Sequence, residues 1–90
     1  HASDVARMIE LCLKTPYSKG HAFNCGTGKG TSVGELADII TKLSGKGLAP
    51  ESAPARKGDI KDSVADISKA AKMLGYKPRI KLEKGLAELL

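Results

Sequence analysis

The sequence predicts a small α/β domain that is mostly helical, with about four helices and two or three short strands. Three observations lead to this expectation. Apolar residues recur at the helical period in four segments, glycine and proline interrupt these segments, and a short apolar run precedes a glycine-rich turn. The chain has 90 residues, which is one domain at most, so a complete two-domain enzyme does not fit.

The first expected helix covers residues 5–13. Ser3 and Asp4 are candidate N-caps, and Pro16 stops the helix. Its apolar side chains fall at the 3.6-residue period: Val5, Met8, Ile9, Cys12 and Leu13.

Residues 21–25 resemble a short strand that runs into Gly26, Gly28 and Gly30. A glycine-rich turn before a helix can cradle a phosphate. The spacing of these glycines matches neither the dinucleotide fingerprint G-x-G-x-x-G nor the phosphate loop G-x-x-x-x-G-K-[ST]. We therefore expect a structural strand-to-helix turn. No Tyr-x-x-x-Lys pair, G-x-S-x-G elbow or other catalytic motif is present in the sequence.

The second expected helix is capped by Ser32, with Glu35 at the capping-box spacing, and is closed by Gly45. Its stripe of apolar residues is expected to be buried: Val33, Leu36, Ala37, Ile40 and Leu43. Part of this stripe, and the apolar face of the first helix, would have been shaped against another domain. Exposed apolar patches and self-association are therefore expected for the chain alone.

The second half of the chain is expected to contain two shorter helices. Residues 48–54 carry prolines and form at best an edge strand, and residues 55–62 form a polar connection. A brief extended piece from Val64 leads to Asp66, the candidate cap of a helix over residues 67–74 that ends at Gly75. A last helix over about residues 82–90 has its leucines on one side.

The composition of the chain indicates which kinds of partner it can bind. The net charge is +5, and residues 56–90 hold nine basic and five acidic side chains, so this half attracts anions. Interspersed charges and three aromatic residues favour small phosphorylated ligands over nucleic acid.

Cys12 and Cys25 lack a metal-binding or redox spacing and are expected to be buried, unreactive free thiols. No metal site is expected. The absence of an apolar run of ~18 residues predicts a cytoplasmic protein without membrane contact.

The string Arg56-Lys57-Gly58-Asp59 suits a nucleotide. A guanidinium can clamp a phosphate through two parallel hydrogen bonds, and a glycine allows close backbone approach. A carboxylate can accept hydrogen bonds from two neighbouring sugar hydroxyls. By itself, such a string is more often a solvated charged loop.

The order of several strings resembles the C-terminal part of the extended short-chain dehydrogenase/reductases that act on nucleotide sugars, particularly the UDP-glucose 4-epimerases. The resemblance covers nearly all of residues 1–90. The strings are His1-x-Ser3-Asp4-Val5-Ala6, Phe23-Asn24-x-Gly26-Thr27-Gly28, Ser32-Val33-x-Glu35-Leu36, Arg56-x-Gly58-Asp59-Ile60, Ser63-Val64-Ala65-Asp66-Ile67-Ser68-Lys69-Ala70 and Leu74-Gly75-Tyr76-x-Pro78.

The resemblance implies that residues 1–90 are the nucleotide-sugar-binding part of a larger Rossmann-type enzyme. It implies that Arg56 contacts the diphosphate of the substrate and Asp59 its ribose, and the substrate is expected to be a UDP-sugar. Lys57 stands where the family usually has proline. The NAD loop and the Tyr-x-x-x-Lys pair would lie in an N-terminal NAD-binding domain preceding His1. The chain itself would be inactive and would bind no cofactor, while the parent would be an NAD-dependent isomerase and a possible homo-oligomer.

Two alternatives stay open. The parent could be a nucleotide-sugar dehydratase or reductase of the same family. The chain could also be a non-enzymatic basic module that binds RNA or an acidic protein surface; a steep dependence of binding on salt would identify a true nucleic-acid binder.

Overall fold

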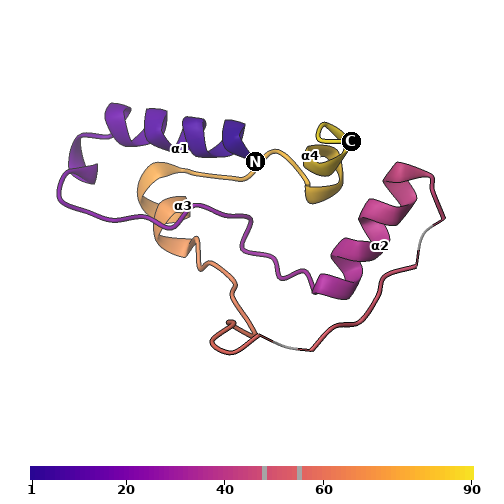
Figure 1. Ribbon diagram of the computed structural model, residues 1–90. Helices are drawn as coiled ribbons and strands as arrows, with labels where there is room; N and C mark the ends of the chain where they lie inside the picture. The colour runs from indigo at the N-terminus through magenta and orange to yellow at the C-terminus, as the bar shows by residue number, and fades with distance from the viewer. Residues whose placement is uncertain (48, 55) are drawn as a thin grey trace.

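The computed structural model describes residues 1–47, 49–54 and 56–90, and the regular structure within these ranges is helical (Figure 1). Helix α1 packs with α3, and α2 packs with α4. The molecule is elongated and flat, with principal extents of 49, 31 and 15 Å. The elements are α1 (Ala2–Lys14), the short 3₁₀ helix η1 (Pro16–Ser18), α2 (Val33–Ser44), α3 (Ser68–Leu74) and α4 (Leu82–Ala87).

The expected α/β fold is wrong, because no strand is present in the described ranges. Residues 21–25 lie beside the segment that leads into α3, but no backbone ladder joins the two. Asn24 instead donates from its side-chain Nδ2 to the carbonyl oxygen of Asp66 at 3.4 Å. A strand needs a partner that supplies regular backbone hydrogen bonds, and side-chain contacts replace them here. The expected edge strand over 48–54 is also absent from 49–54; positions 48 and 55 lie outside the described residues.

Helix α1 is confirmed, but its cap differs from the expected one. His1 is the N-cap, and its Nδ1 accepts a hydrogen bond from the backbone N–H of Ser3 at 3.1 Å. Asp4 lies inside the first turn and is buried. The helix ends at Lys14 because Pro16 favours an extended conformation in the residue before it, and Thr15 has φ −100° and ψ 108°.

The other helix ends follow local signals. Ser32 Oγ accepts from the backbone N–H of Glu35 at 3.1 Å, which confirms the cap of α2. Gly45 and Gly75 close α2 and α3 in the left-handed conformation, as expected. Asp66 acts one position earlier than a standard cap, since its carboxylate accepts from the backbone N–H of Ser68 at 2.9 Å. Helix α4 ends at Ala87, short of the expected residue 90.

The core is small and lies between α1 and α3. Its buried residues are Met8, Ala70, Leu74 and Tyr76. No residue of α2 is buried, so the expected buried stripe of that helix is wrong: Val33 is 83% exposed, and Ile40 and Leu43 are also exposed. On α1, Val5, Ile9 and Leu13 are exposed as well, which confirms the expected apolar patches. In the described part of the chain, no helix is long and apolar enough to cross a membrane.

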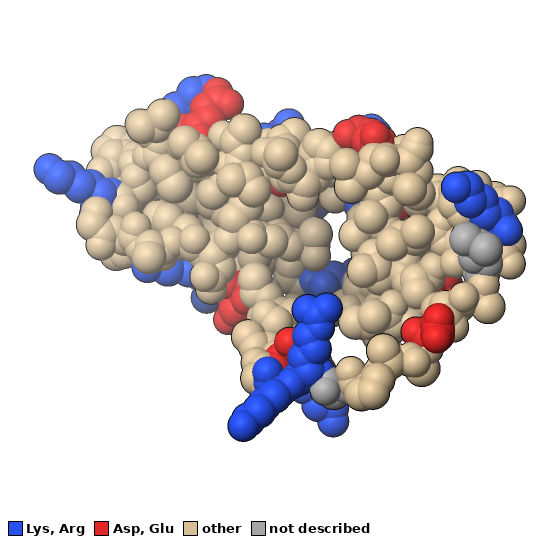
Figure 2. Space-filling model, in the orientation of Figure 1, with Lys and Arg blue, Asp and Glu red and all other residues tan. Residues whose placement is uncertain are grey.

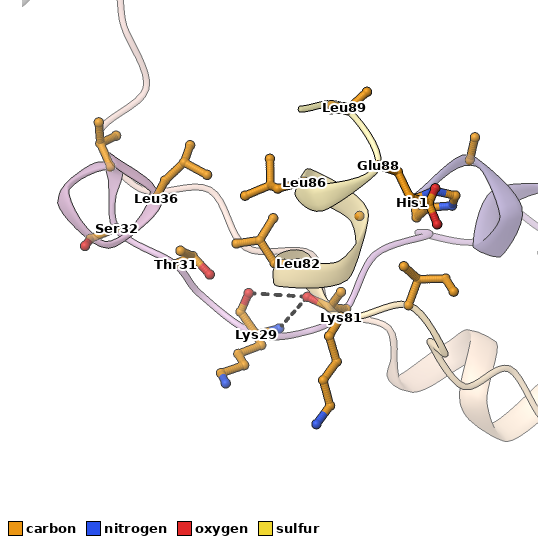
Figure 3. Close-up of a pocket in the computed structure, with 15 residues that line it drawn as sticks. His1, Lys29, Thr31, Ser32, Leu36, Lys81, Leu82, Leu86, Glu88 and Leu89 are labelled. Carbon is orange, nitrogen blue, oxygen red and sulfur yellow. Dashed lines mark hydrogen bonds and ion pairs between the residues drawn. The ribbon is translucent and has the colours of Figure 1, made fainter. Parts of the chain in front are cut away.

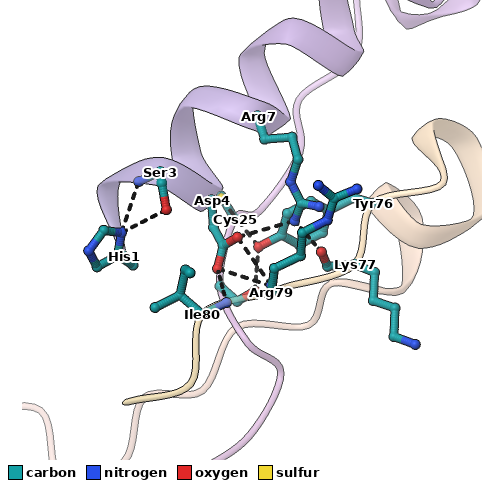
Figure 4. A network of polar contacts seen from close by, with 10 residues as sticks. His1, Ser3, Asp4, Arg7, Cys25, Tyr76, Lys77, Arg79 and Ile80 are labelled. Carbon is teal, nitrogen blue, oxygen red and sulfur yellow. Dashed lines mark hydrogen bonds and ion pairs between the residues drawn. The ribbon is translucent and has the colours of Figure 1, made fainter. Parts of the chain in front are cut away.

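A buried carboxylate joins α1 to the chain that follows α3. Asp4 is 5% exposed and accepts hydrogen bonds from the backbone N–H groups of Arg79, at 3.2 and 3.3 Å, and Ile80, at 3.1 Å (Figure 4). The guanidinium of Arg7 donates to Asp4 at 3.2 Å and to the carbonyl oxygen of Lys77. Four contacts therefore fix residues 77–80 against the first turns of α1.

The protonation of Asp4 reflects these contacts. Burial by itself raises the pKa of the carboxyl. The hydrogen bonds from Ile80 and Arg79 and the positive charge of Arg7 outweigh burial, so the pKa of Asp4 lies below its ordinary value of 3.8. The side chain is ionised at neutral pH, and its charge is compensated by donors on both sides.

We predict that Asp4→Ala lowers the free energy of unfolding by about 2 kcal/mol at pH 7, because two buried backbone N–H groups lose their acceptor. The pKa of Asp4 is lower in the folded than in the unfolded chain, so its contribution is complete above the ordinary carboxyl pKa and is lost as the pH falls below it. Urea unfolding at several pH values measures both effects.

The matched control is Asp38→Ala, which removes an exposed carboxylate from α2. It should leave the urea midpoint nearly unchanged. Equal destabilisation by both variants at pH 7, or an Asp4→Ala deficit that persists undiminished in acid, would contradict the role given to Asp4.

Candidate functional site

The structure places Arg56 and Asp59 at the two ends of one exposed turn. The backbone N–H of Asp59 donates to the carbonyl oxygen of Arg56 at 3.3 Å, and Gly58 has φ +87°, a conformation that favours glycine. Both side chains are exposed. Within the described residues, neither side chain forms a hydrogen bond or an ion pair, so both are available to an external ligand.

Arg56 and Asp59 share one turn, but the turn does not enclose them in a pocket. The two cavities described below are lined by other residues. A ligand held by Arg56 and Asp59 would therefore need further contacts from elsewhere. The chain supplies a charged, accessible loop and not a complete pocket at this point.

The glycines of residues 26–30 pack closely against other parts of the protein, although the strand expected before them is absent from the described residues. A Cβ atom on Gly26 would lie 3.2 Å from the Ala65 side chain, and one on Gly28 would lie 3.1 Å from Ile67. Gly28 also has φ +72°. The segment thus packs closely along the residues that lead into α3, which leaves these glycines committed to protein contacts.

Tyr76 anchors the same segment. Its side chain is part of the core. Its hydroxyl donates to the carbonyl oxygen of Gly26 at 2.9 Å and accepts from the thiol of Cys25, with 3.7 Å between Sγ and the oxygen. Burial, together with the Cys25 contact, raises the pKa of Tyr76 to about 12. Such a phenol stays protonated and is unsuited to act as a general base at neutral pH.

Both thiols were expected to be buried, and both are more exposed than expected. Cys25 is exposed, so the prediction of a buried thiol is wrong for this residue; no neighbouring strand covers its segment. Cys12 is partly buried beside the core. The described residues contain no cluster of histidine, cysteine or acidic side chains suited to a metal ion.

Sequence reasoning missed an apolar cavity of about 600 Å³ between α2 and α4 (Figure 3). Leu36 of α2 faces Leu82 and Leu86 of α4 across it. The leucine spacing in both helices was a signal for an apolar face, but it indicated burial and not a cavity. A second cavity, of about 500 Å³, lies between Gly28 and the start of α3.

Comparison with known proteins shows that the chain is similar over nearly its whole length to part of several nucleotide-sugar 4-epimerases, as the resemblance predicted. UDP-glucose 4-epimerase of Yersinia pestis is 37% identical over 90 residues, which cover 98% of this chain and 27% of that protein. UDP-glucose 4-epimerase of Dictyostelium discoideum is 39% identical over 80 residues, or 86% of this chain and 23% of that protein.

A relative with a different named substrate is dTDP-L-rhamnose 4-epimerase of Burkholderia thailandensis, 33% identical over 96% of this chain and 24% of that protein. The chain thus spans about a quarter of the length of these relatives. No family model and no solved structure matches it.

We predict that Gly28→Ala lowers the free energy of unfolding by about 2 kcal/mol, from the positive φ and the contact with Ile67 together. Gly47→Ala is the matched control, since Gly47 has φ +62° but open space around its Cα. It should cost only about 1 kcal/mol. Denaturant titration compares the two. Equal losses would mean that the close packing of Gly28 does not matter.

Proposed function

We propose that this chain is the nucleotide-sugar-binding, C-terminal portion of an NAD-dependent enzyme like UDP-glucose 4-epimerase. The observation that carries the proposal is the similarity to several proteins named as 4-epimerases, which extends over 86 to 98% of this chain in the three relatives above. Because the match spans only part of each relative, the chain by itself is proposed to be inactive. The presence of a dTDP-sugar epimerase among the relatives leaves the base and the sugar open.

Arg56 and Asp59 are the proposed substrate contacts. The guanidinium of Arg56 would grip the diphosphate through two parallel hydrogen bonds, and the carboxylate of Asp59 would accept from the ribose hydroxyls. Their exposure and their position on one turn support this assignment. A nucleotide sugar bound here would be held through its nucleotide, at a distance from the reacting carbon of the sugar.

Such remote anchoring has a catalytic use, because binding energy from non-reacting parts of a substrate supports orientation at the reacting centre. In the proposed enzyme, NAD would accept a hydride from the sugar and return it. The sequence of this chain contains no dinucleotide fingerprint, so we propose that the NAD site lies in an N-terminal domain. A dehydratase or reductase of the same family would use the same anchoring.

The charge distribution gives less support to a non-enzymatic basic module. On the face seen in Figure 2, lysine and arginine side chains lie around the edge, several of them together at the lower edge beside acidic side chains, and a broad central area carries few charges. A polyanion binder is expected to present a continuous basic patch. The partner that this surface favours is a small phosphorylated ligand at one place.

We predict that Arg56→Ala in the full-length enzyme raises the KM for UDP-glucose about 10- to 100-fold, since a charge-assisted contact is worth ~1.5 to 3 kcal/mol. Arg56→Lys should recover only part of the loss, because an ammonium lacks the planar two-point grip. Asp59→Asn should reduce discrimination between the ligand and its 2′-deoxy analogue. Steady-state kinetics with each variant measures these effects.

Lys61→Ala is the control, since it removes another exposed positive charge from the same segment. It should change the KM less than about twofold, and NAD affinity should be the same in every variant. An Arg56→Ala enzyme whose KM stays within about twofold of the parent value would show that the turn is ordinary surface.

A further inference from the structure

The cavity between α2 and α4 has the properties of a ligand site. Its volume of about 600 Å³ lies within the range of roughly 300 to 1,000 Å³ that is usual for small-molecule pockets. Such pockets are mostly apolar, with a few polar groups that orient the ligand. Here the apolar part comes chiefly from one residue type: Leu36, Leu82, Leu86 and Leu89.

The charges at the rim are unevenly balanced. At one end, the Nε2 atom of His1 lies 2.8 Å from the carboxylate of Glu88, so this acidic group has a partner. Elsewhere on the rim, Lys29 and Lys81 leave the cavity on the same side, as Figure 3 shows. Neither lysine has an ion-pair partner within the part of the chain that the structure describes. The lysine side of the rim is therefore positively charged and uncompensated.

We propose that this cavity binds a small amphipathic anion, with an apolar body among the leucines and a carboxylate or phosphate group beside Lys29 and Lys81. Charge complementarity selects the anionic group, since Glu88, the only acidic side chain among the described lining residues, is held by His1. Long lysine side chains can turn towards such a group while their stems cover apolar surface. The site is separate from the proposed nucleotide contacts, because neither Arg56 nor Asp59 lines it.

Decanoate and its uncharged analogue decanol are suitable probes, and titrations of the 90-residue chain followed by amide NMR shifts locate their binding. Decanoate should bind saturably and shift residues of α2 and α4. The double variant Lys29→Gln/Lys81→Gln should weaken decanoate binding about 3- to 10-fold and leave decanol binding unchanged. Leu86→Asp should weaken binding of both probes.

The control Lys19→Gln/Lys46→Gln removes the same charge from exposed positions that do not line the cavity. It should leave decanoate binding unchanged, whereas equal weakening would reveal a net-charge effect and overturn the proposal. Shifts confined to the exposed face of α1 would also overturn it. A dimer that excludes decanoate and that Leu86→Asp dissociates would also overturn the proposal, because a second copy would then fill the cavity. Sedimentation detects such a dimer. Lysine to glutamine changes at exposed positions should leave the helices intact, which circular dichroism checks.

Discussion

The carboxylate of Asp4 connects parts of the chain that are more than seventy residues apart, and other long-range contacts lie beside this link. By accepting from the backbone of Arg79 and Ile80, it holds the residues after α3 against α1. This places Arg7 5.7 Å above the ring of Tyr76, a distance suited to a cation–π contact. Tyr76 in turn bonds to Gly26, so the glycine segment is fixed to the same centre.

These polar links matter because the apolar core is thin. A domain of this size has little surface to bury, and in the part of the chain that the structure describes only four hydrophobic residues are buried. The two helix pairs meet mainly through connecting segments, and Asp4 and Tyr76 hold two of these segments, at Ile80 and at Gly26. The apolar cavity lies between α2 and α4, beside the segments that lead into these helices. Under the proposed function, the exposed faces of α1 and α2 would pack against the rest of a longer enzyme.

Sequence signals predicted the features that depend on neighbouring residues. The helices, the Ser32 cap and the left-handed ends at Gly45 and Gly75 were predicted correctly, because each depends on a few adjacent residues. The strand over 21–25 was not, because a strand depends on a partner that local pattern does not reveal. Asp4 has the sequence context of a cap, and its actual partners near residue 80 could not be inferred from spacing.

The candidate site was predictable only in part. The charge types of Arg56 and Asp59 suggested phosphate and ribose contacts, and the family resemblance alone gave them a role. The structure adds that they share one exposed turn. The cavity was hidden because apolar spacing shows which face of a helix avoids water, not whether two such faces meet fully. The burial of Cys25 was predicted wrongly because it depended on the strand over 21–25, which did not form.

The most direct test of the proposed function is a crystal structure of the full-length protein with a bound UDP-sugar. Our account predicts guanidinium nitrogens of Arg56 at about 2.7 to 2.9 Å from diphosphate oxygens. It also predicts the carboxylate of Asp59 within hydrogen-bond distance of the ribose hydroxyls. A bound nucleotide that contacts neither residue, with the turn facing solvent, would contradict it.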